Sequence, residues 1–192
     1  MKKIAKTIVH KKTLILLSAI IILFGLNLQL THAQNGEDAP VAPEWVVSQW
    51  INSKPLSLTE LKGKVVIVEF FQLWCPGCNR FSIPLMLDWE KKYKDNENVQ
   101  LVSIHTVFEG HDYQTPQRLK KFIHEKDINH PVAIDKHEPG SLTPVTMHLY
   151  QTRGTPEMAI IDKNGKIRLQ LFGNFDREMA ETLIAQLIQE EK

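Results

Sequence analysis

Residues 69–78 read EFFQLWCPGC and hold both cysteines of the chain, Cys75 and Cys78, in one Cys-x-x-Cys pair. The residues before the pair, 65–71, are mostly β-branched or aromatic and nearly all apolar, which predicts a strand buried on both faces of a sheet. The residues after the pair, 81–93, have the pattern of a helix with one buried face. The cysteines are therefore expected where a strand hands over to a helix.

This junction favours a reactive thiol. The first turn of a helix presents backbone N–H groups without intrahelical partners and the positive end of the helix dipole, and both stabilise a thiolate. In such settings the pKa of a cysteine falls from about 8.5 to roughly 3.5 to 7.5. Pro76 suits a first helical turn, because the N–H that proline lacks would be unpaired there. We expect the outer cysteine, Cys75, to be nucleophilic near neutral pH.

Two other roles for the pair are weaker. Structural zinc takes four ligands, and the sequence has neither a second cysteine pair nor a nearby Cys/His knuckle. A purely structural disulfide across so short a loop would remove little entropy from the unfolded chain. The pattern therefore indicates a redox dithiol, for which no cofactor is implied.

Charge is distributed unevenly along the 192 residues. Of the 23 basic residues, five are lysines within residues 1–33, a segment without any acid, so the remainder carries 18 basic against 22 acidic residues and a formal charge of −4. A mildly acidic remainder gives no basis for nucleic-acid binding. The length and the ordinary apolar and charged fractions predict one well-buried domain plus a tail.

The amino-terminal residues have the layout of a secretory signal. Five lysines are followed by an apolar run over residues 14–30 and then by Thr31, His32 and Ala33, and cleavage is expected after Ala33. The alternative is an uncleaved anchor in the inner membrane, since 17 residues is at the lower limit for crossing a bilayer. Either case predicts a domain in the periplasm or another extracytoplasmic compartment. Disulfides are permitted there, yet the chain has one pair, which suggests that its cysteines act on other proteins.

The rest of the chain divides into a lead-in and a domain. Residues 34–43 are rich in Asn, Gly, Asp and Pro, and a flexible lead-in that contributes nothing to the core is expected there. In the domain, residues 44–192, we expect an edge strand at 45–51, a short helical turn at 57–64, and strands at 99–105 and 131–135. We also expect helices at 118–126 and 144–150, with Thr115 and Pro116 as the cap and first turn before the first of these helices. This alternation of strands and helices predicts βαβ units with parallel pairing. Asn164-Gly165 between two apolar runs predicts an antiparallel hairpin, followed by a helix that Asp176 caps and that extends through Glu191.

These motifs together resemble the thioredoxin superfamily, and in particular the TlpA/ResA-like extracytoplasmic thiol-disulfide oxidoreductases. The resemblance covers residues 45–188 and rests on Trp74-Cys-x-x-Cys, on the acid Glu69 within the preceding strand, and on Gly154-Thr155-Pro156 before the hairpin. It implies a thioredoxin-like α/β fold: a central mixed sheet flanked by helices, with a βα insertion and a carboxy-terminal hairpin and helix. It also implies a cis bond before Pro156, in a loop that packs against the active Cys75–Cys78 disulfide.

Glu69 stands six residues before Cys75, where thioredoxins have a buried aspartate. A carboxyl group inside a buried strand should have a raised pKa, because burial penalises the charged form. The resemblance implies that Glu69 exchanges a proton with Cys78. The alternative is a solvated Glu69 at the sheet edge. The sequence also departs from the family pattern, since Pro84 follows Cys78 by six residues where most relatives have five, and Phe81 replaces an acid that many relatives carry.

The resemblance further implies that Cys75 attacks a substrate disulfide and Cys78 resolves the mixed disulfide. Trp74, Thr155 and Pro156 are the expected substrate-binding residues, and Pro76 and Gly77 are expected to tune the reduction potential. Reduction of client proteins is favoured, with electrons from a membrane-bound thiol donor.

The sequence leaves two alternative functions. One is a copper-binding redox chaperone that holds Cu(I) with Cys75, Cys78 and a histidine, since soft thiolates select Cu(I). The other is a thiol peroxidase, although the sequence has no Pro-x-x-x-Thr-x-x-Cys pattern. The histidines at 105, 111, 124, 130, 137 and 148 show no metal-ligand spacing and are expected to be solvated or packed. Convergence of His111, Asp112, Asp135 and His137 in space stays open.

Overall fold

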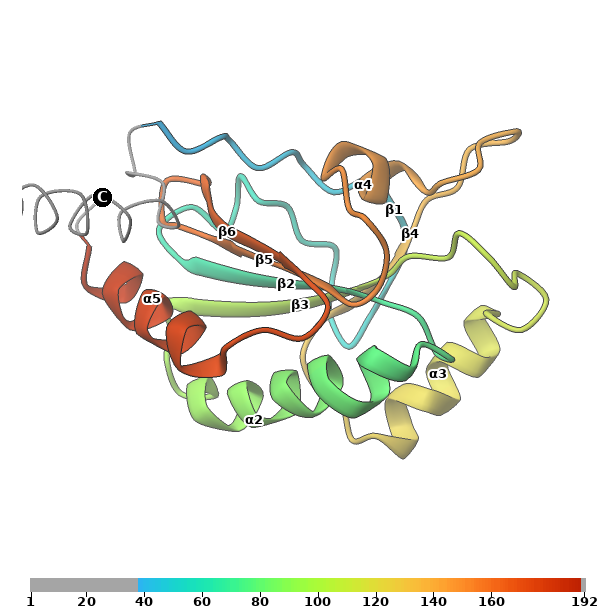
Figure 1. The fold of residues 1–192 in the computed structure, drawn as a ribbon, viewed down its shortest axis with the longest axis horizontal. Helices are drawn as coiled ribbons and strands as arrows, with labels where there is room; N and C mark the ends of the chain where they lie inside the picture. The colour runs from blue at the N-terminus through green and yellow to red at the C-terminus, as the bar shows by residue number, and fades with distance from the viewer. Residues whose placement is uncertain (1–37, 191–192) are drawn as a thin grey trace, which may run out of the picture. The chain divides into compact units, whose positions relative to one another are not determined.

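The computed structural model describes residues 38–190, and the expected leader at residues 1–33 lies outside them. These residues form one six-stranded sheet with strand order β1-β4-β3-β2-β5-β6 (Figure 1). The strands are β1 (Val47–Ile51), β2 (Val65–Phe71), β3 (Val99–His105), β4 (Val132–Asp135), β5 (Glu157–Ile161) and β6 (Ile167–Phe172). The helical elements are η1 (Cys78–Ser82), α2 (Ile83–Tyr93), α3 (Pro116–Glu125), α4 (Val145–Leu149) and α5 (Arg177–Gln189). Within residues 38–190 no helix is long and apolar enough to cross a membrane.

The sheet is mixed, as the sequence predicted. β3 pairs in parallel with both β2 and β4, whereas β2–β5, β5–β6 and β1–β4 are antiparallel. The parallel pairs belong to the alternating strand and helix segments, and the antiparallel β5–β6 pair is the predicted hairpin, with Gly165 at a φ of 83° in its turn. The predicted edge strand is also confirmed, because β1 lies at one end of the sheet.

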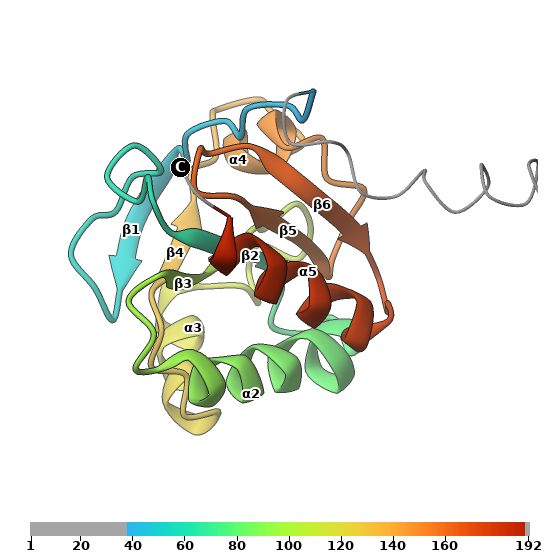
Figure 2. The ribbon, with the colours of Figure 1, turned by 90° about the vertical axis from the view of Figure 1, so that its left-hand side faces the viewer.

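β2 lies inside the sheet and is buried along its whole length. Val65 and Ile67 face one layer, formed with residues of α2 and α5, and Val66 and Val68 face the opposite layer, which includes Tyr150 beyond α4. Figure 2 shows α2 and α5 together on one side of the sheet and α4 on the other. This two-sided burial explains why the strand is nearly continuous in apolar residues, and it makes Glu69 the exception within it.

Capping side chains set two helix starts. The Thr115 hydroxyl accepts from the backbone N–H of Arg118 before α3, and the Asp176 carboxylate accepts from Glu178 and Met179 before α5. Both caps were predicted, because Thr and Asp satisfy N–H groups that lack intrahelical partners.

The helical segment after Cys75 starts as an α-helix at residues 76–77 and changes to a π-turn at Cys78. In η1 the N–H of Ile83 donates to the carbonyl oxygen of Cys78, five residues earlier. A π-turn inserts one additional residue into a helix. It therefore accommodates the six-residue spacing between Cys78 and Pro84, so that Pro84 enters α2 at its first turn, where proline is tolerated.

The prediction of a lead-in without core contacts was wrong for residues 39–42. Ala39 and Ala42 are buried, and Val41 forms an antiparallel bridge with Lys166. The Ala42 N–H donates to Gly165, and Pro40 accepts from the N–H of Ile167. Since β6 lies at the end of the sheet, this segment covers the first part of an otherwise unpaired strand edge.

Candidate active site

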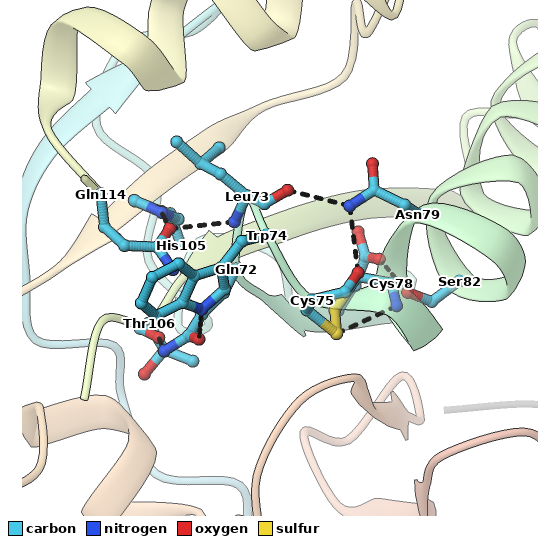
Figure 3. The surroundings of a disulfide bond; sticks show 11 residues. Gln72, Leu73, Trp74, Cys75, Cys78, Asn79, Ser82, His105, Thr106 and Gln114 are labelled. Atoms are coloured by element: carbon cyan, nitrogen blue, oxygen red, sulfur yellow. Dashed lines mark hydrogen bonds between the residues drawn. A yellow bond between two sulfur atoms is a disulfide. The ribbon is translucent and has the colours of Figure 1, made fainter. Parts of the chain in front are cut away.

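Cys75 and Cys78 form a disulfide just beyond the carboxyl end of β2 (Figure 3). Cys75 is 6% exposed and Cys78 is fully buried, so Cys75 is the more accessible sulfur. The pair lies where the strand turns into the helical segment, which is the predicted junction.

The loop presents a backbone donor to Cys75. The N–H of Cys78 lies 3.0 Å from Cys75 Sγ. The Asn79 side chain holds the loop, since its amide donates to the carbonyl oxygens of Leu73 and Cys75 at 2.9 and 3.0 Å. A fixed N–H beside sulfur stabilises negative charge on it. The geometry thus provides the thiolate-stabilising donor expected of a helix start.

Glu69 is buried, with 1% of its surface exposed. Its Oε1 accepts a hydrogen bond from Ser82 Oγ at 2.5 Å, and its Oε2 accepts one from Ser103 Oγ at 2.7 Å. Burial raises the pKa of Glu69 above 4.5, and the two hydroxyl donors offset only part of that rise. The predicted burial is therefore confirmed, and the alternative of a solvated Glu69 is excluded. Ser82 belongs to the same π-turn as Cys78, so the acid is tied directly to the helical segment of the inner cysteine.

Sequence reasoning missed what lies behind Glu69. Ser103 Oγ is also 2.8 Å from Nε2 of His130, and Nδ1 of His130 is 2.6 Å from a carboxyl oxygen of Glu90. The signal that could have found Ser103 is the strand register, because Glu69 and Ser103 are direct neighbours in the parallel β2–β3 pair. That register could not be assigned from the sequence alone.

The loop before β5 approaches the cysteine pair from the other side. The Thr155–Pro156 bond is cis, as the resemblance implied. A Cβ atom added to Gly77 would lie 2.9 Å from Cδ of Pro156, so the loop and the Cys-x-x-Cys turn are in close contact. Buried Glu157 holds the loop by accepting from the backbone N–H of Arg153 at 2.7 Å and from the Gln170 amide at 2.8 Å.

Trp74 is held by a second loop, which lies between β3 and α3. The Trp74 ring stacks on the Tyr113 ring, with centroids 5.6 Å apart. The guanidinium group of Arg118 lies over the Tyr113 ring, 4.2 Å from its centroid. The Trp74 N–H donates to the side chain of Gln72 at 3.0 Å. Gly110 lies against the Trp74 ring so closely that a Cβ there would overlap it. The sequence pointed to Trp74 but gave no indication of its partners.

These groups surround a groove beside Cys75. Its volume is about 540 Å³, and it is lined by Gln72, Trp74, Cys75, Pro76, Phe108, Glu109, Gly154, Thr155 and Phe172. Of the predicted substrate-binding residues, Trp74 and Thr155 line the groove, while Pro156 lies behind it against Gly77. The structure therefore brings the predicted substrate-binding residues and Cys75 to one place.

The histidines have separate environments. His105 is buried and its pKa falls to about 4 through burial, and Gln114 bridges it to the backbone N–H of Leu73. The rings of His111 and His137 lie 5.2 Å apart, but Asp135 is buried elsewhere and accepts from Thr106, Thr146 and Met147. Within residues 38–190 no group of three or more His, Cys, Asp or Glu side chains could hold a metal ion.

The chain is similar to known proteins in sequence and fold. Residues 40–170 match the sequence model of the AhpC/TSA family. A solved thiol-disulfide isomerase from Corynebacterium glutamicum is 39% identical, with a TM-score of 0.76 over 81% of this chain and 99% of that protein. The thiol-disulfide oxidoreductase ResA of Bacillus thuringiensis is 29% identical over 140 residues, 73% of this chain and 72% of ResA.

Protein DipZ of Mycobacterium bovis is 30% identical over 174 residues, which cover 86% of this chain. They cover only 24% of DipZ, so the chain spans about a quarter of that relative's length.

Proposed function

This chain belongs to the AhpC/TSA family and has the thioredoxin fold of its TlpA/ResA-like relatives, and we propose that it is an exported thiol-disulfide oxidoreductase that reduces disulfides in client proteins. The observation that carries the proposal is the placement of Cys75. Its sulfur lines a groove and accepts a backbone N–H bond, while its partner Cys78 is fully buried. Relatives named thiol-disulfide oxidoreductase or isomerase support the same reaction class.

The reaction follows from this asymmetry. In the reduced protein the Cys75 thiolate attacks one sulfur of a substrate disulfide, which breaks the substrate S–S bond and forms a mixed disulfide with Cys75. The Cys78 thiolate then attacks Cys75 Sγ, so the mixed disulfide breaks and the Cys75–Cys78 disulfide forms. Two electrons pass from the dithiol to the substrate, which leaves with two thiols. Cys78 is suited to resolve and unsuited to attack, because it is shielded from solvent.

Glu69 supplies the base for this second step. Cys78 must lose its proton before it can attack, and a buried carboxyl with a raised pKa can accept and return a proton near neutral pH. Its link to Ser82, in the π-turn that also contains Cys78, keeps it on the side of the inner cysteine.

The substrate is an extended polypeptide segment. Thr155 lines the groove, where its backbone can pair with a substrate strand. Trp74 and Phe172 provide apolar surface on the same groove, and both are partly exposed. Glu109 adds an acid at its edge.

The direction of electron flow is proposed as reduction, and the location as the periplasm or a similar compartment. The amino-terminal pattern of five lysines and an apolar run supports export. A reductant in an oxidising compartment needs a supply of electrons, and a membrane-bound thiol protein is the proposed donor.

The test compares variants lacking residues 1–33 in reduction of a model protein disulfide by a chemical thiol. Cys75→Ser should lose turnover, because the attacking sulfur is gone. Cys78→Ser should accumulate a mixed disulfide through Cys75, visible as a mass increase that a reductant reverses. Turnover retained by Cys75→Ser contradicts the proposal. Consumption of peroxide, or retention of one Cu(I) per chain after dialysis without turnover, would favour the two alternative functions instead.

A further inference from the structure

Building on the proposed function, we propose that Ser103, His130 and Glu90 form a proton relay that connects Glu69 to the surface on the side away from the substrate groove. Glu69 must release the proton that it takes from Cys78 before the next turnover. Because Glu69 is sealed inside the sheet, a route to water is required.

The four side chains form one unbroken chain of contacts. Glu69 Oε2 lies 2.7 Å from Ser103 Oγ, Ser103 Oγ lies 2.8 Å from His130 Nε2, and His130 Nδ1 lies 2.6 Å from Glu90 Oε2. All three distances are those of good hydrogen bonds. The groups come from β2, β3, the loop before β4 and α2, so the relay crosses the fold and does not follow one element.

Exposure increases along the chain in one direction. Glu69 and Ser103 are each 1% exposed and His130 is 7% exposed, whereas the Glu90 side chain is 21% exposed. Glu90 and His130 line a surface pocket of about 510 Å³. That pocket and the groove at Cys75 have no lining residue in common. A substrate in the groove would therefore leave the outer end of the relay open to water.

The chemistry of each member suits transfer. A serine hydroxyl donates one proton and accepts another, and imidazole can take a proton on one ring nitrogen while it releases one from the other. In the outward step the Glu69 proton moves to Ser103 Oγ, the Ser103 hydroxyl proton moves to His130 Nε2, and the Nδ1 proton moves to the Glu90 carboxylate. Glu90 then gives a proton to water. The inward step reverses each transfer. Each step moves one proton across the relay, and the two steps together return every group to its starting protonation state.

The two ends of the relay differ in pKa. Burial raises the pKa of Glu69, while at Glu90 the hydrogen bonds from His130 and the backbone outweigh partial burial and lower the pKa. Glu90 is therefore ionised and can accept a proton, but transfer from Glu69 to Glu90 runs against this pKa difference, so the release of the proton from Glu90 to water completes the outward step. Other charged or titratable groups around the outer pocket are Lys64, Tyr93, Lys94, Asp95 and Glu97.

The test measures the steady-state rate at which the full chain, supplied with a chemical thiol as electron donor, reduces a model disulfide from pH 5 to 9, because Glu69 must release its proton between turnovers. His130→Ala should slow the reaction at least about tenfold at pH 7, since positioned proton transfer typically contributes 10²- to 10⁴-fold. Added imidazole should restore the rate in proportion to its concentration, because the vacated space adjoins the outer pocket. A purely structural role for His130 would give no such dependence, and its absence overturns the proposal.

A second pair of variants covers the case in which His130→Ala does not fold. Ser103→Ala removes the central hydroxyl, and Ser103→Thr keeps it. The relay requires Ser103→Ala to be at least about tenfold slower than Ser103→Thr, and equal rates at every pH would overturn it. The Glu69→Gln variant tests the role of Glu69 as the base separately from the relay. If Glu69→Gln reacts slowly while His130→Ala reacts at the wild-type rate, only the relay is contradicted. If the wild-type chain does not react with disulfides at all, the proposed function itself is contradicted.

Discussion

Glu69 is a carboxyl group on the buried face of a central strand, and both of its oxygens accept from serine hydroxyls. Hydroxyls satisfy the hydrogen-bonding capacity of the acid without bringing a permanent positive charge that would hold it ionised. Such an environment keeps the pKa raised, which suits a group that must both take and give a proton.

Replacing Glu69 by Gln should stabilise the protein at high pH. Above about pH 4.5 the unfolded chain releases the Glu69 proton while the folded chain holds it, so the wild type loses stability as pH rises toward the raised folded pKa. An amide cannot ionise and escapes this loss. Glu69→Gln should be more stable than wild type at pH 8, by on the order of 1 kcal/mol for each unit of pKa elevation, and should lose that advantage at pH 4. Urea unfolding at both pH values measures the difference, and a constant difference would contradict the pKa argument.

At this scale the sequence predicted the chemically distinctive residues but not their partners. Two cysteines three apart and one acid in an apolar strand stand out in any reading of the sequence. Ser103, His130 and Glu90 do not, because serines, surface acids and scattered histidines are common. Their contacts join side chains that lie 27 to 40 residues apart in the chain and meet only after folding.

Among the elements, the loop that supports Trp74 depends on one glycine. Gly110 has a φ of 61° and lies under the Trp74 ring, which in turn stacks on Tyr113. Only glycine combines this backbone conformation with such close approach. The loop and Trp74 therefore form one unit beside the groove.

Gly110→Ala should disturb this unit, and Gly140→Ala is its matched control. Both glycines have positive φ, at 61° and 81°, but a Cβ at Gly110 would overlap Trp74 whereas at Gly140 nothing lies within 4 Å. Both variants are destabilised by placing alanine at a positive φ. The free energy of unfolding of Gly110→Ala should fall by about 1–3 kcal/mol more, because the added Cβ overpacks against Trp74. It should also alter tryptophan fluorescence and slow substrate reduction. Equal losses of stability in the two variants would show that Trp74 moves aside freely.

The boundaries of several strands and helices could be predicted from the hydrophobic pattern and the capping residues, but the π-turn could not. Strands 65–71 and 99–105 were predicted to the residue, and Thr115 and Asp176 were recognised as caps. The shifted position of Pro84 was visible, but whether a loop, a kink or a π-turn absorbed the additional residue depended on packing. Local propensity carries no signal for an i to i−5 bond.

At the scale of the whole domain, residues 40–42 cover part of the edge of the sheet at β6. β6 would end the sheet with free backbone groups, and residues 40–42 satisfy part of that edge through Val41, Ala42 and Pro40. Composition alone suggested a flexible lead-in, because Gly, Pro, Asn and Asp are frequent in it. The backbone bonds that hold it depend on an edge whose position only the complete sheet defines.

Removal of residues 38–42 should therefore destabilise the domain without unfolding it. A chain that begins at Pro43 loses two backbone hydrogen bonds and the burial of Ala39 and Ala42, a cost on the order of 1–3 kcal/mol. The control is a chain that begins at Asp38. Light scattering should also show more self-association of the shorter chain, since the edge of β6 is then open. Equal stability and equal scattering would mean that this segment contributes nothing.

The global topology could be predicted because three separated motifs point to the same fold. The Cys-x-x-Cys pair after a buried strand, the acid within that strand and Gly154-Thr155-Pro156 before a hairpin jointly indicate a thioredoxin-like sheet. The strand order and the two separate pockets, which have no lining residue in common, needed the structure, because they depend on contacts between residues far apart in sequence.

The most direct test of the account is the reduction potential of the Cys75–Cys78 couple in the chain lacking residues 1–33, measured by equilibration against glutathione. A reductant of client proteins should have a potential near that of thioredoxin, about −270 mV. A value near about −120 mV would mean that the protein oxidises its clients and would contradict the proposed direction of electron flow.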